Sequence, residues 1–387
     1  MKRIYIEGLG LVEGHFSGVG QYILGILRGM DELIDEAKYK GEPFPEIKVI
    51  IPYNTRTRFK SFKFKHITYK AFPLSFKIMG GLWYRGKLPP IDLWCGRGNY
   101  IFTRFVDMPL LYNKCATVIY DLSYELYRQY SDERNASFLS KRVKESLATT
   151  DKVITISKNA KKDIVDFYKL KDADVTVITP ATDPRLFYRR STKEISEVKR
   201  KYNIEGDYIL ALSNLEPRKN VDTLVRVFCK LPKETISNTS LLLVGVSGWK
   251  TEQLFQEIVE KVDEGFNIIR PSKYVLDKDK PAIISGAKML VYPSHYEGFG
   301  MPPLEALACG VPVITSDNSS LPEVVGDAGV MVPSNNDEKL LDAIERYLRD
   351  YTNIQDKVIQ TGPERAALFS WKESAKKMIQ VAQDLDS

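Results

Sequence analysis

The chain has 387 residues, 43% of them hydrophobic and 27% charged, which is ordinary for a globular protein and predicts two domains. The four cysteines have no C-x-x-C spacing and the three histidines are scattered, which argues against a disulfide framework and a zinc site. Residues 1–190 carry 32 Lys and Arg against 21 Asp and Glu, whereas residues 191–387 carry 24 against 29, so the first half faces an anionic partner more readily.

Short apolar runs alternate with helical patterns in the first half of the chain. Residues 17–34 place apolar side chains on one helical face after Ser17, which fits an N-cap, and residues 137–148 form a second helical pattern. The run DPRLFYRRSTKE at 183–194 breaks the alternation and is typical of a linker. The expected strands are RIYIEG (3–8), IKVIIPY (47–53), ATVIYDL (116–122), KVITIS (152–157) and VTVITPA (175–181).

The second half repeats the alternation. Helices are expected at NVDTLVRVFCKL (220–231) and EQLFQEIVEKV (252–262). Such alternation predicts parallel sheets covered on both faces, and therefore an α/β fold of two doubly wound, Rossmann-like domains facing across a cleft. The expected strands are YILALSN (208–214), SLLLVGV (240–246), FNIIRP (266–271), AKMLVYPS (287–294) and VPVITS (311–316).

The stretch EGFGMPPLEALACGVPVITS follows an expected strand and carries carboxylates at Glu297 and Glu305. Pro302 or Pro303 fits the first position of a two-turn helix, with Met301 as its N-cap. Ligands of open parallel sheets bind beyond the carboxyl ends of the strands, where free helix N–H groups hold oxygen atoms. A helix cap or a solvated loop charge would explain either glutamate alone. Together they favour a polyhydroxyl ligand such as a ribose or a hexose.

The stretch SNLEPRKN places Arg218 and Lys219 immediately before an expected helix. The helix dipole disfavours cations at that end, so the arrangement is explained if an anion lies among them. Arg and Lys beside free helix N–H groups suit a diphosphate. The alternative is a pair of solvated charges.

These stretches together resemble the retaining glycosyltransferase family four, with the GT-B architecture. They look most similar to the bacterial mannosyl- and rhamnosyltransferases of polysaccharide assembly. The resemblance covers most of the chain and is weaker over residues 35–115. It implies an acceptor-binding domain at 1–187, a nucleotide-sugar-binding domain at 188–367 and a C-terminal helix at 368–387 that packs back on the first domain. Besides Glu297–Glu305, it rests on residues 307–332, 208–220, 153–164 and 369–379.

The resemblance also implies roles for individual residues. Glu305 would bind the nucleotide ribose, and Arg218 with Lys219 would bind the diphosphate. The family often has His-Asp where this chain has Tyr120 and Asp121, so Tyr120 would act through its hydroxyl, leave the role to the backbone, or simply pack. The implied catalytic group is Glu297, Arg218, Lys219, Asp121 and Tyr120. The implied donor-binding group is Glu305, Gly298, Phe299, Gly300, Met301, Asn214, the base-contacting Tyr274 and Val275, and Gly18 and Gly20 of a glycine-rich loop.

The implied reaction moves a hexose from a nucleotide-diphosphate sugar to a saccharide or lipid-diphosphate-linked acceptor with retention of configuration. The first expectation for the donor is GDP-mannose, ahead of dTDP- and UDP-sugars. No cofactor or metal is expected, because DKD at 277–279 precedes a short helix and suits a helix start. A nucleotide-sugar epimerase or hydrolase of the same fold, and a non-catalytic sugar-nucleotide-binding subunit, remain as alternatives.

The stretch from Lys48 to Lys87 contains no acidic residue, and aromatic residues are interleaved with its basic ones. Residues 56–72 are expected to form an edge strand with one wet face. The stretch would be an ordinary surface strand or would dock on an anionic membrane. No nucleic-acid module is visible, so nucleic acid is not an expected partner. The N-terminus resembles neither a signal peptide nor a membrane span, and a cytoplasmic protein, peripheral at the inner face of the membrane, is expected.

Overall fold

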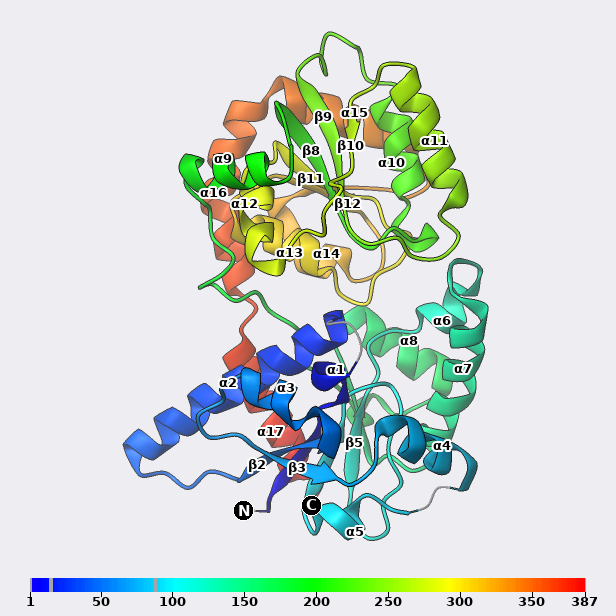
Figure 1. Ribbon diagram of the computed structural model, residues 1–387, viewed down its shortest axis with the longest axis vertical. Coiled ribbons are helices and arrows are strands. Elements are labelled where there is room, and N and C mark those ends of the chain that lie inside the picture. Colours follow the sequence, from blue (N-terminus) through cyan, green and yellow to red (C-terminus); the bar gives the residue numbers. More distant parts are fainter. Residues whose placement is uncertain (1, 14–16, 87–88, 387) are drawn as a thin grey trace. The chain divides into compact units, whose positions relative to one another are not determined.

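The computed structural model describes residues 2–13, 17–86 and 89–386, without the side chains of residues 84–86. These residues form two compact units, each a parallel sheet with helices on both sides (Figure 1). The first unit comprises the described parts of 1–126, 133–180 and 370–387, and the second comprises Tyr127–Asp132 and Ala181–Phe369. Apart from the short segment Tyr127–Asp132, the chain changes unit after residues 180 and 369, compared with the expected 187 and 367.

The first unit contains a seven-stranded sheet in the order β3-β2-β1-β4-β5-β6-β7, with every pair of neighbours parallel. Its strands are β1 (Ile4–Glu7), β2 (Ile47–Pro52), β3 (Thr68–Phe72), β4 (Asn99–Phe102), β5 (Cys115–Val118), β6 (Lys152–Thr155) and β7 (Val175–Val177). Its α-helices are α1 (Leu9–Val12), α2 (Gly18–Lys40), α3 (Arg56–Ser61), α4 (Phe76–Gly86), α5 (Asp92–Cys95), α6 (Ser123–Leu126), α7 (Glu133–Leu147), α8 (Lys158–Tyr168) and α17 (Trp371–Asp384).

The second unit contains a six-stranded sheet in the order β10-β9-β8-β11-β12-β13, again parallel throughout. Its strands are β8 (Asp207–Leu212), β9 (Thr239–Val244), β10 (Ile268–Ile269), β11 (Met289–Tyr292), β12 (Val313–Ser316) and β13 (Val330–Val332). Its α-helices are α9 (Thr192–Lys201), α10 (Val221–Phe228), α11 (Glu252–Asp263), α12 (Lys280–Ser285), α13 (Met301–Ala308), α14 (Leu321–Val325), α15 (Asp337–Arg349) and α16 (Tyr351–Ala367).

The central strands are buried along their whole length. Every residue of β1, β9 and β11 is buried, as expected for strands that are covered on both faces and therefore carry no alternating polar side. Two parallel, doubly covered sheets confirm the α/β fold class predicted from the sequence. Each sheet presents the carboxyl ends of its strands at one edge, and this edge positions the residues considered below.

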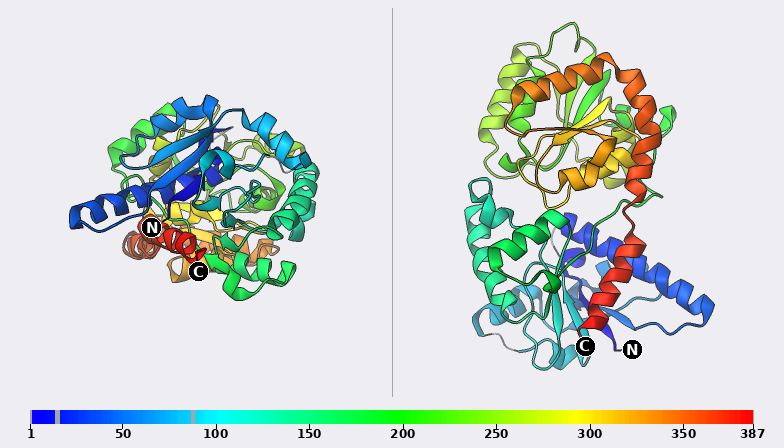
Figure 2. Two further views of the ribbon diagram at one scale, coloured as in Figure 1. Left: turned by 90° about the horizontal axis from the view of Figure 1, so that it is seen from below. Right: turned by 180° about the vertical axis from the view of Figure 1, so that it is seen from behind.

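The last helix packs within the first unit, against α2. A Cβ added at Gly25 would lie 2.3 Å from the indole of Trp371, and one at Gly29 would lie 2.5 Å from its carbonyl oxygen, so both positions require glycine for this close approach. Figure 2 shows α17 beside α2 and the two chain ends close together. An ion pair of 2.6 Å between Lys2 and Asp386 ties the ends to each other.

The strand expected over residues 56–72 is only partly correct. Arg56–Ser61 forms helix α3, and the edge strand is confined to Thr68–Phe72 beside β2. Phe59 is buried on α3 and its ring packs edge-on against Tyr69, with 5.5 Å between centroids. The aromatic residues therefore gather into a cluster through a helix and a turn, which a single extended strand would not allow.

Candidate functional site

Three loops of the second unit meet at one edge of its sheet. They follow β8, β11 and β12, which are neighbours in the sheet and run parallel, so their carboxyl ends lie side by side. The loop after β8 contains Arg218 and Lys219, and the loop after β11 contains Glu297. Asn220 joins the first two loops, because its side-chain amide donates to the carbonyl of Pro293 at 3.0 Å.

Glu297 is the centre of a buried ionic cluster. Its side chain is 7% exposed, and one carboxylate oxygen accepts a hydrogen bond of 2.7 Å from the ammonium of Lys219. The other oxygen accepts from Arg218 at 3.3 Å. Lys219 also donates to the hydroxyl of Tyr292 at 2.9 Å, so two of its three N–H groups are used within the protein.

Arg218 is held by three acceptors around this cluster. Its guanidinium donates to Glu216 at 2.8 Å and to the carbonyl of Tyr296 at 2.7 Å, in addition to Glu297. Glu216 is itself buried, so the cluster contains two cations and two carboxylates and is close to neutral. Arg218, Lys219 and Glu297 were predicted separately from the sequence, and the structure brings all three together.

The electrostatics of the cluster favour an ionised Glu297. Burial alone would raise the pKa of its carboxyl, but Lys219 and Arg218 outweigh burial and lower that pKa to about 2. For Lys219, burial and the neighbouring Arg218 lower the pKa of the ammonium, and Glu297 opposes them. Glu297 is therefore ionised at neutral pH, and its charge opposes the lowering of the Lys219 pKa.

Residues 298–300 are buried and lead into α13, which begins at the half-buried Met301. Gly300 caps the helix with φ 107°, and a Cβ there would lie 2.8 Å from Leu321, so only glycine suits the position. The expected N-cap at Met301 was one residue too late, since Met301 is the first helical residue. The backbone amides of residues 298–301, Phe299 included, donate no hydrogen bond to another described residue. They remain available to a ligand.

Ser320 fixes this turn from the loop after β12. Its hydroxyl lies 2.9 Å from the carbonyl of Glu297 and 2.7 Å from that of Phe299, and neighbouring Ser319 accepts from the amide of Glu297 at 3.0 Å. In the sequence, this segment was part of the family resemblance only, and no role was predicted for it. Two adjacent hydroxyl residues directly after a buried strand were the signal that could have identified it.

Glu305 lies within α13 and is 6% exposed. No hydrogen bond joins its carboxylate to another of the described residues. Burial raises its pKa to about 7, with Lys280 opposing the rise and Asp277 adding to it. A buried carboxylate without a protein partner is costly unless something else satisfies it, and a pair of ligand hydroxyls would do so.

The residues expected to contact the base lie in a segment near Glu305. Tyr274 is 63% exposed and Val275 is buried, in the segment between β10 and α12. Lys280 interacts electrostatically with both Glu305 and Tyr274, which places the three residues in one neighbourhood. Asn214, on the loop after β8, is exposed.

The DKD segment does not form a cluster of metal ligands in the described structure. Asp279 precedes α12, accepts from the hydroxyl of Tyr202 at 2.7 Å and pairs with Lys201. Within residues 2–13, 17–86 and 89–386, no group of three or more His, Cys, Asp or Glu is placed to hold a metal ion. In the same residues, no helix is long and apolar enough to cross a membrane.

The remaining predicted residues belong to the first unit. Tyr120 is buried, donates its hydroxyl proton to the carbonyl of Thr103 at 2.9 Å, and has a pKa raised by burial. Asp121 accepts from the amide of Ser123 at 2.8 Å. Gly18 and Gly20 lie in the first turn of α2 rather than in a loop, because the helix begins at Gly18.

Solved structures share this fold. Sucrose-phosphate synthase from Thermosynechococcus elongatus superposes with a TM-score of 0.72 at 18% identity, covering 100% of this chain and 99% of that one. Anabaena Alr3699/HepE, solved with UDP and glucose, gives 0.72 at 16% identity, covering 100% of both chains. The fold is that of the GT-B glycosyltransferases.

Sequence comparisons identify the family. Residues 193–365 match the family described as Glycosyl transferases group 1. The chain is 33% identical over 273 residues to the O-antigen chain mannosyltransferase B of Escherichia coli. This match covers 70% of this chain and 71% of that protein. It is 27% identical over 252 residues to the E. coli serotype-specific mannosyltransferase WbdA, of which the match covers 30%. The chain belongs to glycosyl transferases group 1 and is a glycosyltransferase, which confirms the resemblance seen in the sequence.

Proposed function

We propose that the protein is a retaining mannosyltransferase that moves mannose from GDP-mannose to a saccharide or lipid-diphosphate-linked acceptor during polysaccharide assembly. The mannosyltransferase names of its E. coli relatives support the sugar and the pathway class. The observation that carries the donor site is the buried carboxylate of Glu305, which has no hydrogen-bond partner among the described residues. It lies on the helix that begins at residues 298–301, whose amides donate to none of the described residues either.

In this proposal the second unit binds the donor. Glu305 accepts hydrogen bonds from the ribose hydroxyls, while Glu297 and the turn after it hold the mannose hydroxyls. Lys219 has an N–H group left for the diphosphate, and Arg218 lies beside it. Catalysis is then mainly orientation of the donor and stabilisation of the departing diphosphate. The acceptor hydroxyl attacks from the face that the diphosphate leaves, and a leaving-group oxygen takes its proton.

The donor assignment predicts nucleotide binding that does not depend on a metal ion. Isothermal titration calorimetry with GDP, UDP, dTDP and ADP is expected to show GDP as the tightest ligand, with an unchanged Kd after EDTA treatment. The physical reason is that protein cations stand beside the proposed diphosphate position. Turnover that disappears with EDTA and returns with Mg²⁺ or Mn²⁺ contradicts metal independence. Tighter binding of another nucleotide contradicts GDP.

The alternatives give a different result with donor alone. A nucleotide-sugar epimerase or hydrolase consumes GDP-mannose without an acceptor at full rate, and a non-catalytic subunit binds it without turnover. A glycosyltransferase needs the acceptor hydroxyl for its full rate.

We also propose that the first unit docks on an anionic membrane surface, from the cytoplasmic side. Lys60, Lys63, Lys70 and Lys77 are exposed on α3, on the turn after it, on β3 and on α4, respectively. On α4, Ile78 and Leu82 are 53% and 46% exposed, which gives apolar side chains beside the cations. Each surface Lys near anionic lipid contributes about 1 kcal/mol.

Vesicle co-sedimentation tests this docking. The variant Lys60→Glu/Lys63→Glu/Lys70→Glu is expected to lose binding to phosphatidylserine vesicles at low salt. Lys65 is left unchanged, because its ammonium pairs with Asp35 at 2.9 Å. A matched control replaces the exposed Lys162, Lys169 and Lys171 of the same unit. Equal binding by both variants, or no binding by the wild type, refutes a membrane role.

A further inference from the structure

A second polar cluster lies in the first unit, where β1 and β4 end. Glu7 is the last residue of β1 and is 1% exposed. Its carboxylate accepts from the amide of Thr103 at 2.9 Å and from the guanidinium of Arg104 at 2.9 Å. Because β1 and β4 are parallel neighbours, this pair lies at the edge of the sheet where open α/β folds bind ligands.

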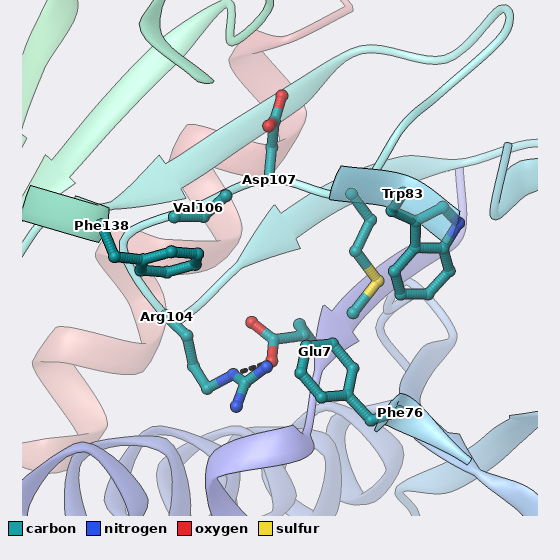
Figure 3. Close-up of a pocket in the computed structure, with 8 residues that line it drawn as sticks. Glu7, Phe76, Trp83, Arg104, Val106, Asp107 and Phe138 are labelled. Atoms are coloured by element: carbon teal, nitrogen blue, oxygen red, sulfur yellow. Dashed lines mark hydrogen bonds and ion pairs between the residues drawn. The ribbon is translucent and has the colours of Figure 1, made fainter. Parts of the chain in front are cut away.

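Aromatic rings line a partly open cavity of about 290 Å³ beside this pair. Figure 3 shows the rings of Phe76 and Phe138 on either side of Glu7 and Arg104, with the indole of Trp83 nearby. The guanidinium of Arg104 lies 4.4 Å from the centroid of the Phe76 ring. The volume is at the lower end of the roughly 300–1,000 Å³ of small-molecule sites, so it suits one small ring.

The polar groups of the cavity suit a neutral ligand. Arg104 is the one cation among the residues that line the cavity, and both Glu7 and Glu13 interact with it, so two carboxylates face one guanidinium and a phosphate or a carboxylate would be repelled. Arg104 uses its Nε on Glu7, and its two terminal nitrogens donate to no described residue, so they are available to a ligand. Asp107 is occupied elsewhere, since its carboxylate accepts from Ser146 at 2.7 Å, and Figure 3 shows it pointing away from the pair.

We propose that this pocket binds a single neutral hexopyranose, the sugar of the acceptor. A pyranose has an apolar C–H face, which the rings of Phe76 and Phe138 can cover. Its hydroxyl edge can accept from Arg104 and donate to the Glu7 carboxylate. The acceptor role rests on the proposed transferase function, whereas binding of the sugar itself does not. The pocket lies wholly within the first unit, and the sequence analysis assigned no role to its residues.

The test uses methyl α-D-mannopyranoside as the probe and the full chain with and without GDP. Phe138→Ala removes one wall from a position that is 39% exposed, and Phe167→Ala on α8 is a matched control with the same 39% exposure. Val106→Trp fills the cavity as a second, independent variant. Saturation-transfer NMR reports binding of the sugar, thermal unfolding reports folding, and calorimetry reports GDP affinity.

The wild type and Phe167→Ala are expected to transfer saturation to the sugar. Phe138→Ala and Val106→Trp are expected to weaken its binding at least fivefold, with unchanged unfolding and GDP affinity. In turnover assays with GDP-mannose, the same two variants raise the acceptor KM and leave kcat nearly unchanged. Equal sugar binding by the wild type and the three variants contradicts a sugar site in this pocket. The absence of sugar binding by the wild type, both with and without GDP, contradicts it as well. Sugar binding without any transfer from a nucleotide sugar contradicts the transferase function but still supports a sugar site in this pocket.

Discussion

Replacing Glu297 with glutamine is expected to reduce turnover about 100-fold and to destabilise the fold by about 3–5 kcal/mol. The substitution keeps the size of the side chain and removes the charge that balances Lys219 and Arg218. Burial already lowers the pKa of the Lys219 ammonium, and without Glu297 its main stabilising neighbour is gone. Lys219 then loses its proton or its position, and both changes weaken a site that depends on orientation.

The two effects of Glu297→Gln are measured separately. Urea unfolding gives the loss of stability, and steady-state turnover with GDP-mannose gives the loss of activity under conditions where the variant is folded. Glu252→Gln, at an exposed position at the start of α11, is the matched control and is expected to change neither. A Glu297→Gln variant with wild-type stability and turnover would show that the cluster supports neither the fold nor the reaction.

Replacing Glu305 with glutamine is expected to weaken GDP-mannose binding by about 1–3 kcal/mol, the scale for a buried polar group that loses its hydrogen-bond partner. In contrast with Glu297, this change is not expected to destabilise the protein at pH 8. Burial raises the pKa of Glu305 from 4.5 to about 7, so folding favours its neutral form. The folded state therefore binds the extra proton, and the stability of the wild type falls as pH rises from about 4.5 to 7.

The raised pKa of Glu305 predicts how stability and GDP-mannose affinity each change with pH. Above pH 7 the ionised Glu305 costs stability, so Glu305→Gln is expected to equal or exceed the wild type there and to match it near pH 4.5. GDP-mannose affinity of the wild type is expected to rise from pH 6 to pH 8, because the ionised carboxylate accepts two ribose hydroxyls. The affinity of Glu305→Gln should stay flat over that range. Parallel pH profiles of the two proteins would exclude Glu305 as the ribose ligand.

The sheets were predictable because their strands are continuously apolar. Runs such as SLLLVGV leave no polar face, and only a strand covered on both sides suits that pattern. The basic segment from Arg56 was harder, because RTRFKSFK matches a helical period as well as an alternating one. The helix is favoured over the strand because Phe59 is buried against β3, and this contact cannot be predicted from the local sequence pattern.

The site was predictable in its parts and not in its connections. Glu297 and Lys219 each stood in a strand–turn–helix pattern, but their ion pair depends on β8 and β11 being neighbours in the sheet. The sequence around Glu7 and Arg104 did not predict a site, because neither residue lies in a recognisable motif. They meet in one cavity only because strands far apart in the sequence are neighbours in the sheet. Sequence patterns therefore identified the loops that carry chemistry, and the order of the strands decided which charges meet.

The most direct test of the proposed reaction is the configuration of the first product formed from GDP-mannose. Proton NMR follows the anomeric signals while the protein acts on the α-linked donor in the presence of mannose-terminated oligosaccharides. The proposal predicts a new α-mannoside as the first product, formed at full rate only when the acceptor is present. A β-mannoside as the first product contradicts retention, and no transfer to any acceptor contradicts the mannosyltransferase assignment.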